Sequence, residues 1–232
     1  MMATRHGLLA YDGVSFQLPR GTEVVGDQEA SAILVDSRGR CWIGTMAGQL
    51  YVLEPGHARL IHSVPGSEGA TLGTLVEDRQ GRIWFALRHG QGFGFWDDNE
   101  GLRLMGPRYW STGPDKIGAM AVGPENRLWL GSASPGEDDG LYELVGESPE
   151  AAGLPGCSIL ALCVDGNGLL WIGTSEGLYR RHDDILTKFT VDDGLPCEIV
   201  TTLLSAPDGV LWIGTEGGGV CCYDGRVFQV IQ

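Results

Sequence analysis

The sequence predicts an all-β fold made of repeated four-stranded units, on the strength of three observations. A tryptophan returns five times in similar surroundings, at Trp42, Trp84, Trp129, Trp171 and Trp212. The steps between these residues are 42, 45, 42 and 41 (84−42, 129−84, 171−129, 212−171), and no segment shows helical periodicity. Glycine occupies 37 of 232 positions, which is typical of a chain with many tight turns. A fixed period of this length with four short strands per repeat predicts a β-propeller.

The fourth repeat shows how each element is predicted. Its continuous apolar run at residues 159–164 predicts an innermost strand A that is covered on both faces. The segment Asp165-Gly166-Asn167-Gly168 predicts a tight turn, because Asn and Gly readily adopt positive φ. Strand B is predicted at 169–174, strand C at 178–181 and a more polar outer strand D at 186–190.

The other repeats follow the same template, with strands A to D in chain order. We predict these strands at 32–36, 42–45, 50–53 and 59–63 in the first repeat, 72–77, 82–87, 94–97 and 102–105 in the second, 117–122, 128–132, 140–144 and 147–151 in the third, and 200–205, 211–215, 220–223 and 227–231 in the fifth. Residues 7–17 closely resemble residues 219–229. The N-terminus is therefore predicted to be a C–D hairpin with no strand A or B before it.

The whole chain, residues 1–232, is predicted to form one propeller domain. Its predicted parts are a half-blade hairpin at 7–28 and five complete blades at 29–66, 67–113, 114–156, 157–196 and 197–232. These parts allow a five-bladed ring with an extra hairpin, a six-bladed ring lacking inner strands, or an open arc completed by another chain. An open arc would expose an unpaired strand edge, which is a template for β-augmentation.

Charge and composition argue against several classes of function. The net charge of −14 argues against nucleic acid and against an anionic membrane surface, because both attract basic proteins. No apolar run approaches the roughly 20 residues of a membrane-spanning helix. The N-terminal residues lack the apolar core of a secretory signal, so we expect a cytoplasmic protein, or a periplasmic one if the chain was excised from a larger sensor. The six cysteines lack zinc-site spacing and are expected to be free thiols.

The repeats carry the pattern Asp-x-x-Gly-x-Leu-Trp-Ile-Gly-Thr, most fully at residues 165–178 and 208–220, with Tyr-Asp-Gly at 223–225 and Gly-Leu-Pro at 194–196. This pattern resembles the two-component regulator propeller repeat over residues 7–232. The second repeat departs most, with Phe85-Ala86-Leu87 in place of Ile-Gly-Thr. The resemblance implies the ligand-binding sensor propeller of a signal-transduction protein. More distantly, the repeat is similar to the propeller of streptogramin (virginiamycin B) lyase, a metal-dependent enzyme.

In a propeller, the A–B and C–D turns lie on one face, and the B–C and D–A loops lie on the other. The A–B turns are uniform, as in Asp36-x-x-Gly39, so we interpret their face as structural. Recognition is predicted on the variable loop face, where Glu176 and Glu216 are placed at matching positions, as are Cys157 and Cys197. The candidate ligand- or partner-binding residues are Arg88, His89, Tyr109, Trp110, Glu137, Asp138, Asp139, Glu176 and Glu216.

Three functions remain open from the sequence. The favoured one is a non-enzymatic module of the sensor or scaffold type, whose partner is a protein or a small, possibly carbohydrate-like, molecule. It requires no catalytic residue, metal or cofactor, and no compact catalytic constellation competes with it. The second is a metal-dependent lyase with His89 as base and Glu137 or Asp139 nearby. The third is a structural subunit, or an oligomer, completed through an open blade edge.

Overall fold

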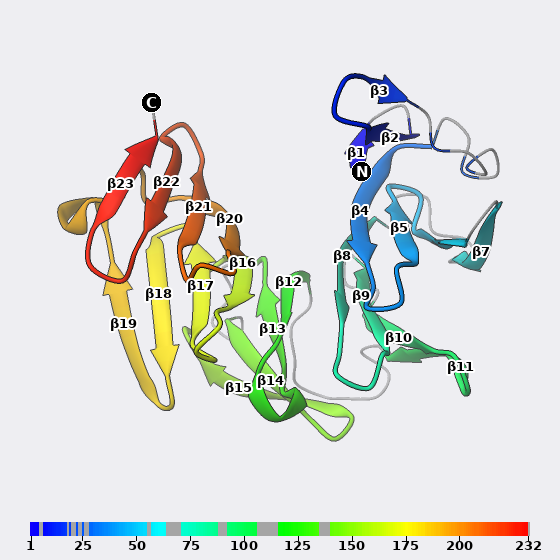
Figure 1. Ribbon diagram of the computed structural model, residues 1–232. Helices are drawn as coiled ribbons and strands as arrows, with labels where there is room; N and C mark the ends of the chain where they lie inside the picture. Colours follow the sequence, from blue (N-terminus) through cyan, green and yellow to red (C-terminus); the bar gives the residue numbers. More distant parts are fainter. Residues whose placement is uncertain are drawn as a thin grey trace. The chain divides into compact units, whose positions relative to one another are not determined.

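The computed structural model describes residues 1–4, 7–17, 19, 22, 25, 28–54, 57–63, 71–87, 92–105, 116–134 and 140–231. The chain divides into two compact units, Met1–Tyr109 and Trp110–Gln232 (Figure 1). The regular structure described is entirely strand, apart from the 3-10 turns η1 (Pro124–Asn126) and η2 (Val191–Asp193). The described residues contain no helix with the length and apolarity needed to span a membrane. The predicted all-β class is confirmed.

The first unit holds three antiparallel sheets, each built from strands consecutive in the chain. The N-terminal sheet contains β1 (Met2–Thr4), β2 (Gly7–Tyr11) and β3 (Phe16–Gln17). The next contains β4 (Ala30–Val35), β5 (Cys41–Thr45), β6 (Gln49–Glu54) and β7 (His57–Ser63). The third contains β8 (Leu72–Glu77), β9 (Ile83–Leu87), β10 (Phe93–Asp97) and β11 (Gly101–Met105).

The second unit holds three four-stranded antiparallel sheets. They are formed by β12 (Ile117–Val122), β13 (Leu128–Ser132), β14 (Leu141–Val145) and β15 (Ser148–Gly153); by β16 (Ile159–Val164), β17 (Leu170–Thr174), β18 (Gly177–His182) and β19 (Ile185–Phe189); and by β20 (Val200–Ser205), β21 (Leu211–Thr215), β22 (Gly219–Tyr223) and β23 (Phe228–Ile231). Each of the five four-stranded sheets supplies strands A to D in chain order, as predicted.

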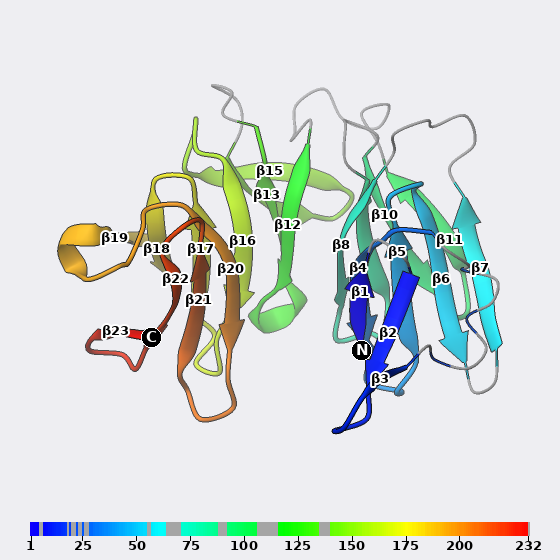
Figure 2. The same ribbon diagram turned by 90° about the horizontal axis from the view of Figure 1, so that it is seen from above.

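The N-terminal sheet differs from the prediction by one strand. Strands β2 and β3 form the expected hairpin, but β1 precedes them and pairs with β2 through Met2↔Leu9 and Thr4↔Gly7. Strand β1 contacts β4 in the way that a strand B contacts the next strand A within each unit, as β5 contacts β8 and β17 contacts β20 (Figure 2). It is therefore a strand B. The expectation that the hairpin stands alone was wrong, because a run of three residues is long enough to pair but too short to show a pattern.

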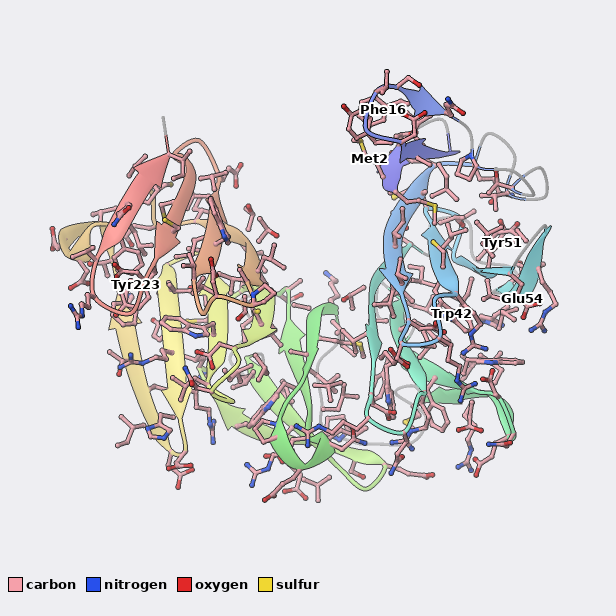
Figure 3. The ribbon with its side chains drawn as sticks, in the orientation of Figure 1. Met2, Phe16, Trp42, Tyr51, Glu54 and Tyr223 are labelled. Carbon is pink, nitrogen blue, oxygen red and sulfur yellow. The ribbon has the colours of Figure 1, made fainter. Side chains whose placement is uncertain are left out.

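The strand-B tryptophans fill the space between consecutive sheets. Trp42 is fully buried and packs with Leu72 and Phe85 of the following sheet (Figure 3). In the second unit, Trp171 packs with Val200 and other residues of β20–β23. Burying such large apolar side chains is the main source of free energy that holds the sheets together.

The glycine of the Trp-Ile-Gly-Thr segment allows the next sheet to approach closely. A Cβ atom placed on Gly173 would lie 2.7 Å from Cγ1 of Val200, and one on Gly131 would lie 2.4 Å from Cγ2 of Ile159. Both distances are far below normal contact. The recurring glycine is therefore explained by packing between sheets.

An aspartate accepts the indole N–H in three repeats; it is buried in the first two and half-buried in the fourth. Trp42 Nε1 donates to Asp36 at 2.9 Å, and Arg40 Nε donates to the same carboxylate oxygen at 2.7 Å. We call such a group, with the aspartate and arginine six and two residues before the tryptophan, a carboxylate triad. The first repeat forms the triad Asp36–Arg40–Trp42 and the second forms Asp78–Arg82–Trp84, whereas the fourth keeps only the Asp165–Trp171 bond at 2.9 Å.

The triads stabilise the ionised aspartates. Although burial opposes ionisation, the hydrogen bonds from Trp42 and Arg40 hold the pKa of Asp36 below its ordinary value, and the pKa of Asp78 is lowered in the same way. A carboxylate with a lowered pKa contributes stability above its ordinary pKa, and this contribution is lost as the pH falls through the folded-state value.

We expect Asp36→Asn to lower the free energy of unfolding by about 1.5–3 kcal/mol at pH 7, because it weakens two hydrogen bonds to a buried charge. The difference from wild type should shrink as the pH falls below the ordinary aspartate pKa of 3.8 and through the lower folded-state value, where the wild-type carboxylate also becomes neutral. Urea unfolding at pH 7 and pH 3 measures both effects. Asp208→Asn is the control, since Asp208 is exposed and accepts a hydrogen bond from the Val210 amide in its turn. Equal losses of unfolding free energy in Asp36→Asn and Asp208→Asn would contradict the prediction.

Candidate functional site

The connections between strands lie at two ends of each sheet, and one end varies more than the other. The A–B turns span equal lengths in all five sheets, for example 36–40 and 165–169, and the C–D turns differ only from 183–184 to 224–227, whereas the D–A connections range from 154–158 to 18–29. The B–C and D–A segments lie at the same end, because backbone hydrogen bonds join them. The amide of Ser175 donates to Ser158 O, and the amide of Glu216 donates to Ile199 O. We call that end the loop end and the opposite one the turn end. The expected concentration of variation at the loop end is confirmed.

Two of the nine predicted site residues fall within the described chain. Glu176 and Glu216 are both exposed and lie at the loop end of β16–β19 and β20–β23. The other seven lie outside the described residues: Arg88, His89, Tyr109, Trp110, Glu137, Asp138 and Asp139.

The strand register corrects two of the predicted equivalences. The amide of Ser175 bonds to Ser158 O at 3.2 Å, and the amide of Glu216 bonds to Ile199 O at 2.9 Å. Glu216 is therefore equivalent to Ser175 and not to Glu176. By the same register, Cys157 is equivalent to Glu198. Both mismatches can be counted from the tryptophans: Glu176 lies five residues after Trp171 but Glu216 four after Trp212, and Cys157 lies 14 residues before Trp171 but Cys197 15 before Trp212.

Around Glu176 the structure gathers a group that we call the Tyr179 cluster: Cys157, Glu176, Tyr179, Lys188 and Glu198. Tyr179 and Lys188 are cross-strand partners on β18 and β19, and Lys188 Nζ lies 5.5 Å from the Tyr179 ring centroid. Their hydrogen bond raises the pKa of Lys188, with Glu176 and Glu198 adding to the effect. Chemically, the cluster offers one cation, two carboxylates, a phenol and a thiol.

Burial governs the neutral groups of the cluster. It raises the pKa of Tyr179, and, together with the charge of Glu176, it raises the pKa of the Cys157 thiol. At neutral pH the thiol is therefore protonated and a poor nucleophile. All six cysteines are free, as expected. Among the described residues, no three His, Cys, Asp or Glu side chains are grouped as metal ligands.

A cleft of about 270 Å³ lies at the turn end of the second unit, between β12–β15 and β16–β19. Its lining includes Pro124, Arg127, Trp129, Asn167, Arg181 and Asp183. We call it the turn-end cleft. Our sequence interpretation missed it because that face was taken to be structural. A signal was nevertheless present: Gly123 stands where three other repeats have the aspartate that binds tryptophan.

Residues 153–176 and 194–217 match the family model described as two component regulator propeller. The matched segments belong to the fourth and fifth repeats, which the sequence pattern also singled out. A comparison with curated proteins found no match.

Solved structures with the same fold include sensor and surface proteins. The extracellular domain assigned to the hybrid two component system BT3049 from B. thetaiotaomicron is 18% identical, with a TM-score of 0.73 over 96% of this chain and 31% of that one. PorZ, a surface component of the type-IX secretion system of Porphyromonas gingivalis, is 19% identical, with a TM-score of 0.75 over 96% and 36%. This chain thus spans about a third of each.

The same fold also occurs in an enzyme. Streptogramin B lyase is 16% identical, with a TM-score of 0.71 over 86% of this chain and 67% of that one. Virginiamycin B lyase from Staphylococcus aureus is similar to the same degree, with a TM-score of 0.71 and 16% identity over 90% and 75%. At these identities the comparisons confirm the β-propeller fold, and they leave function to be argued from the site.

Tyr179→Phe is expected to lower the pKa of Lys188 toward its ordinary value, because the phenol oxygen that binds the ammonium group is removed. NMR titration of the isotopically methylated lysines measures this pKa directly. Tyr51→Phe is the matched control, since Tyr51 holds the equivalent place on β6 and bonds to Gln28 and Gln49. An unchanged Lys188 titration in Tyr179→Phe would show that the phenol does not hold the lysine.

Proposed function

We propose that this chain is a non-enzymatic binding module of the sensor or scaffold type, which recognises its ligand at the loop end of its sheets. The observation that carries the proposal is the Tyr179 cluster, which combines an exposed ammonium group with a half-buried phenol and two carboxylates. Such groups form directional hydrogen bonds to a polar ligand. The less variable turn end supplies a rigid base for the variable loops.

The chemistry of the cluster favours binding over catalysis. The Cys157 thiol and the Lys188 amine are both protonated at neutral pH, since the pKa of each is raised. Neither group is then an activated nucleophile. The ligand class that fits is rich in hydroxyl groups, because hydroxyls both donate to carboxylates and accept from ammonium and phenol groups. A carbohydrate-like molecule meets this description.

The sensor and surface roles of the solved relatives support this proposal. One relative is described as the extracellular domain of a hybrid two component system and another as a surface component of a secretion system. A comparable module would work outside the cytoplasm, and that location stays a prediction.

The proposal is tested with an array of neutral and charged oligosaccharides. We expect at least one probe to bind the wild-type protein and to bind Lys188→Gln about tenfold more weakly, because a charge-assisted hydrogen bond is lost. Arg226→Gln is the control, since Arg226 is an exposed cation in a C–D turn. Mass spectrometry should recover the bound probe unchanged. Cleavage of the probe, equal binding by the two variants, or no binding across the array would overturn the proposal.

A second candidate function, acceptance of a strand from a partner chain, is favoured by the edge of β1. The register places Met2 at the position of Ile172 and Ile213 in other strands B. Those isoleucines are completely buried, whereas Met2 is 47% exposed; Figure 3 marks it on the N-terminal sheet. Among the described strands, β1 pairs only with β2. An edge of this kind is a site for β-augmentation.

The other sheets indicate the chemistry of the missing strand. In the other sheets, strand A places a small residue opposite the glycine of strand B, as in Ala161↔Gly173. The next residue of strand A is large and apolar and lies opposite the isoleucine, as in Leu162↔Ile172. A strand added to β1 would therefore place a small residue opposite Ala3 and a large apolar residue opposite Met2. None of the described strands A can supply it, because each is already paired within its own sheet, and the proposal takes a partner chain as its source.

A labelled peptide with the sequence of residues 199–206 serves as the probe for this edge. Fluorescence polarisation should show saturable binding to the wild type and none to Met2→Lys, because the charge would face the apolar side chain of the added strand. Met46→Lys is the control, as Met46 is similarly exposed at 43%. Equal binding by both variants would refute the idea. A concentration-dependent dimer that is abolished by Met2→Lys would instead identify a second copy as the occupant.

A further inference from the structure

We propose that the turn-end cleft of the second unit binds a small monocarboxylate, which takes the place of an aspartate missing from the third repeat. In the first two repeats, a buried aspartate accepts hydrogen bonds from an arginine and a tryptophan. The third repeat keeps both donors, as Arg127 and Trp129, at the same spacing. At the position of the aspartate it has Gly123. The donors of a carboxylate triad are present without their acceptor.

The turn around Gly123 closes as it does in the complete triads. Gly123 N donates to Arg127 O at 2.8 Å, and the corresponding bond from Asp36 to Arg40 is 2.9 Å. A Cβ atom at Gly123 would lie 2.9 Å from Trp129 Nε1. No side chain fits at this position without movement of the backbone or the indole, so a carboxylate must enter from outside.

The two donors show the effect of the missing acceptor. Trp129 is only 4% exposed, its indole N–H has no acceptor among the described residues, and the residue lines the cleft. The N–H is therefore a donor available to a ligand that enters the cleft. The Arg127 side chain is 51% exposed, against 16% for Arg40, and its Nε lies 3.5 Å from Glu143. Arg127 is thus held loosely beside a tryptophan that lacks an acceptor.

The cleft provides the space and the charge for such a ligand. Trp129 and Arg127 both line its volume of about 270 Å³, which is near the lower limit for ligand pockets and suits a small molecule. The Arg181 guanidinium carbon lies 5.1 Å from the Trp129 ring centroid and adds positive charge, and His182 also lines the site. An incoming carboxylate would meet an N–H donor and cationic groups.

The acidic groups of the cleft limit the ligand to a single carboxylate. Glu125 and Asp183 line the cleft beside the cations, and Asp184 approaches Arg181 at 3.4 Å. These charges would repel a second carboxylate, whereas a hydroxyl group on the ligand could donate to them. A small hydroxy monocarboxylate therefore fits better than a dicarboxylate. The site lies at the turn end of the sheets, opposite the Tyr179 cluster, so the experiments on the two sites test the two proposals independently.

The test follows the tryptophan indole N–H signals of the ¹⁵N-labelled full chain during titration with sodium lactate. Trp129→Phe, which keeps an aromatic ring, identifies the Trp129 signal. We expect a saturable shift of that signal, no comparable shift at Trp171, whose N–H is bonded to Asp165, and no effect of neutral lactamide. Succinate should bind more weakly than lactate.

Arg127→Gln should weaken lactate binding about tenfold, the effect of losing one charge-assisted contact. Arg103→Gln is the control, because the Arg103 side chain is similarly exposed at 54% and lies in the other unit. The proposal is overturned if the Trp129 signal does not shift at lactate concentrations up to roughly 50 mM, well beyond millimolar affinity. It also fails if lactamide gives the same shift, or if Arg127→Gln binds lactate as the wild type does.

Discussion

A buried tryptophan in strand B imposes two demands on each repeat that contains one. Its ring is large enough to fill the space between two sheets, and it brings one N–H group that must find an acceptor when buried. The next sheet meets the apolar demand, because its residues pack against the ring, as Leu72 and Phe85 pack with Trp42. The polar demand is met at the turn, where Asp36 accepts the indole hydrogen. The A–B turn is therefore fixed by the core and has little freedom to vary.

This constraint separates the two ends of the sheets. At the turn end, three A–B turns carry an aspartate that reaches back to the tryptophan, and all five A–B connections have the same length. No such contact restrains the loop end, where connections lengthen and polar groups such as Glu176 and Lys188 come together. A structural demand at one end thus leaves the other end free for recognition. The exception is the third repeat, where the demand at the turn end is unmet.

The sequence was sufficient to predict the propeller, because a tryptophan every 41 to 45 residues leaves few other ways to bury apolar strands. It could not reveal β1, since Met2-Ala3-Thr4 is too short to carry a period. The matching of Glu176 with Glu216 was an error that the sequence itself could have corrected, because Glu176 lies five residues after Trp171 and Glu216 four residues after Trp212. The Tyr179 cluster was missed for a different reason: Cys157 and Lys188 become neighbours only through strand pairing.

The turn-end cleft differs from these cases, because its signal was in the sequence. Loss of the aspartate alone does not create a site: the fifth repeat has Ala206 at the same position, but its Trp212 is 38% exposed, so its N–H can reach water. In the third repeat the loss coincides with a tryptophan that is 4% exposed and with a retained arginine. The two retained donors beside a cleft are what make the missing acceptor informative, and only the structure shows that the cleft is there. A departure from a repeat is therefore most informative where the rest of the arrangement has been kept.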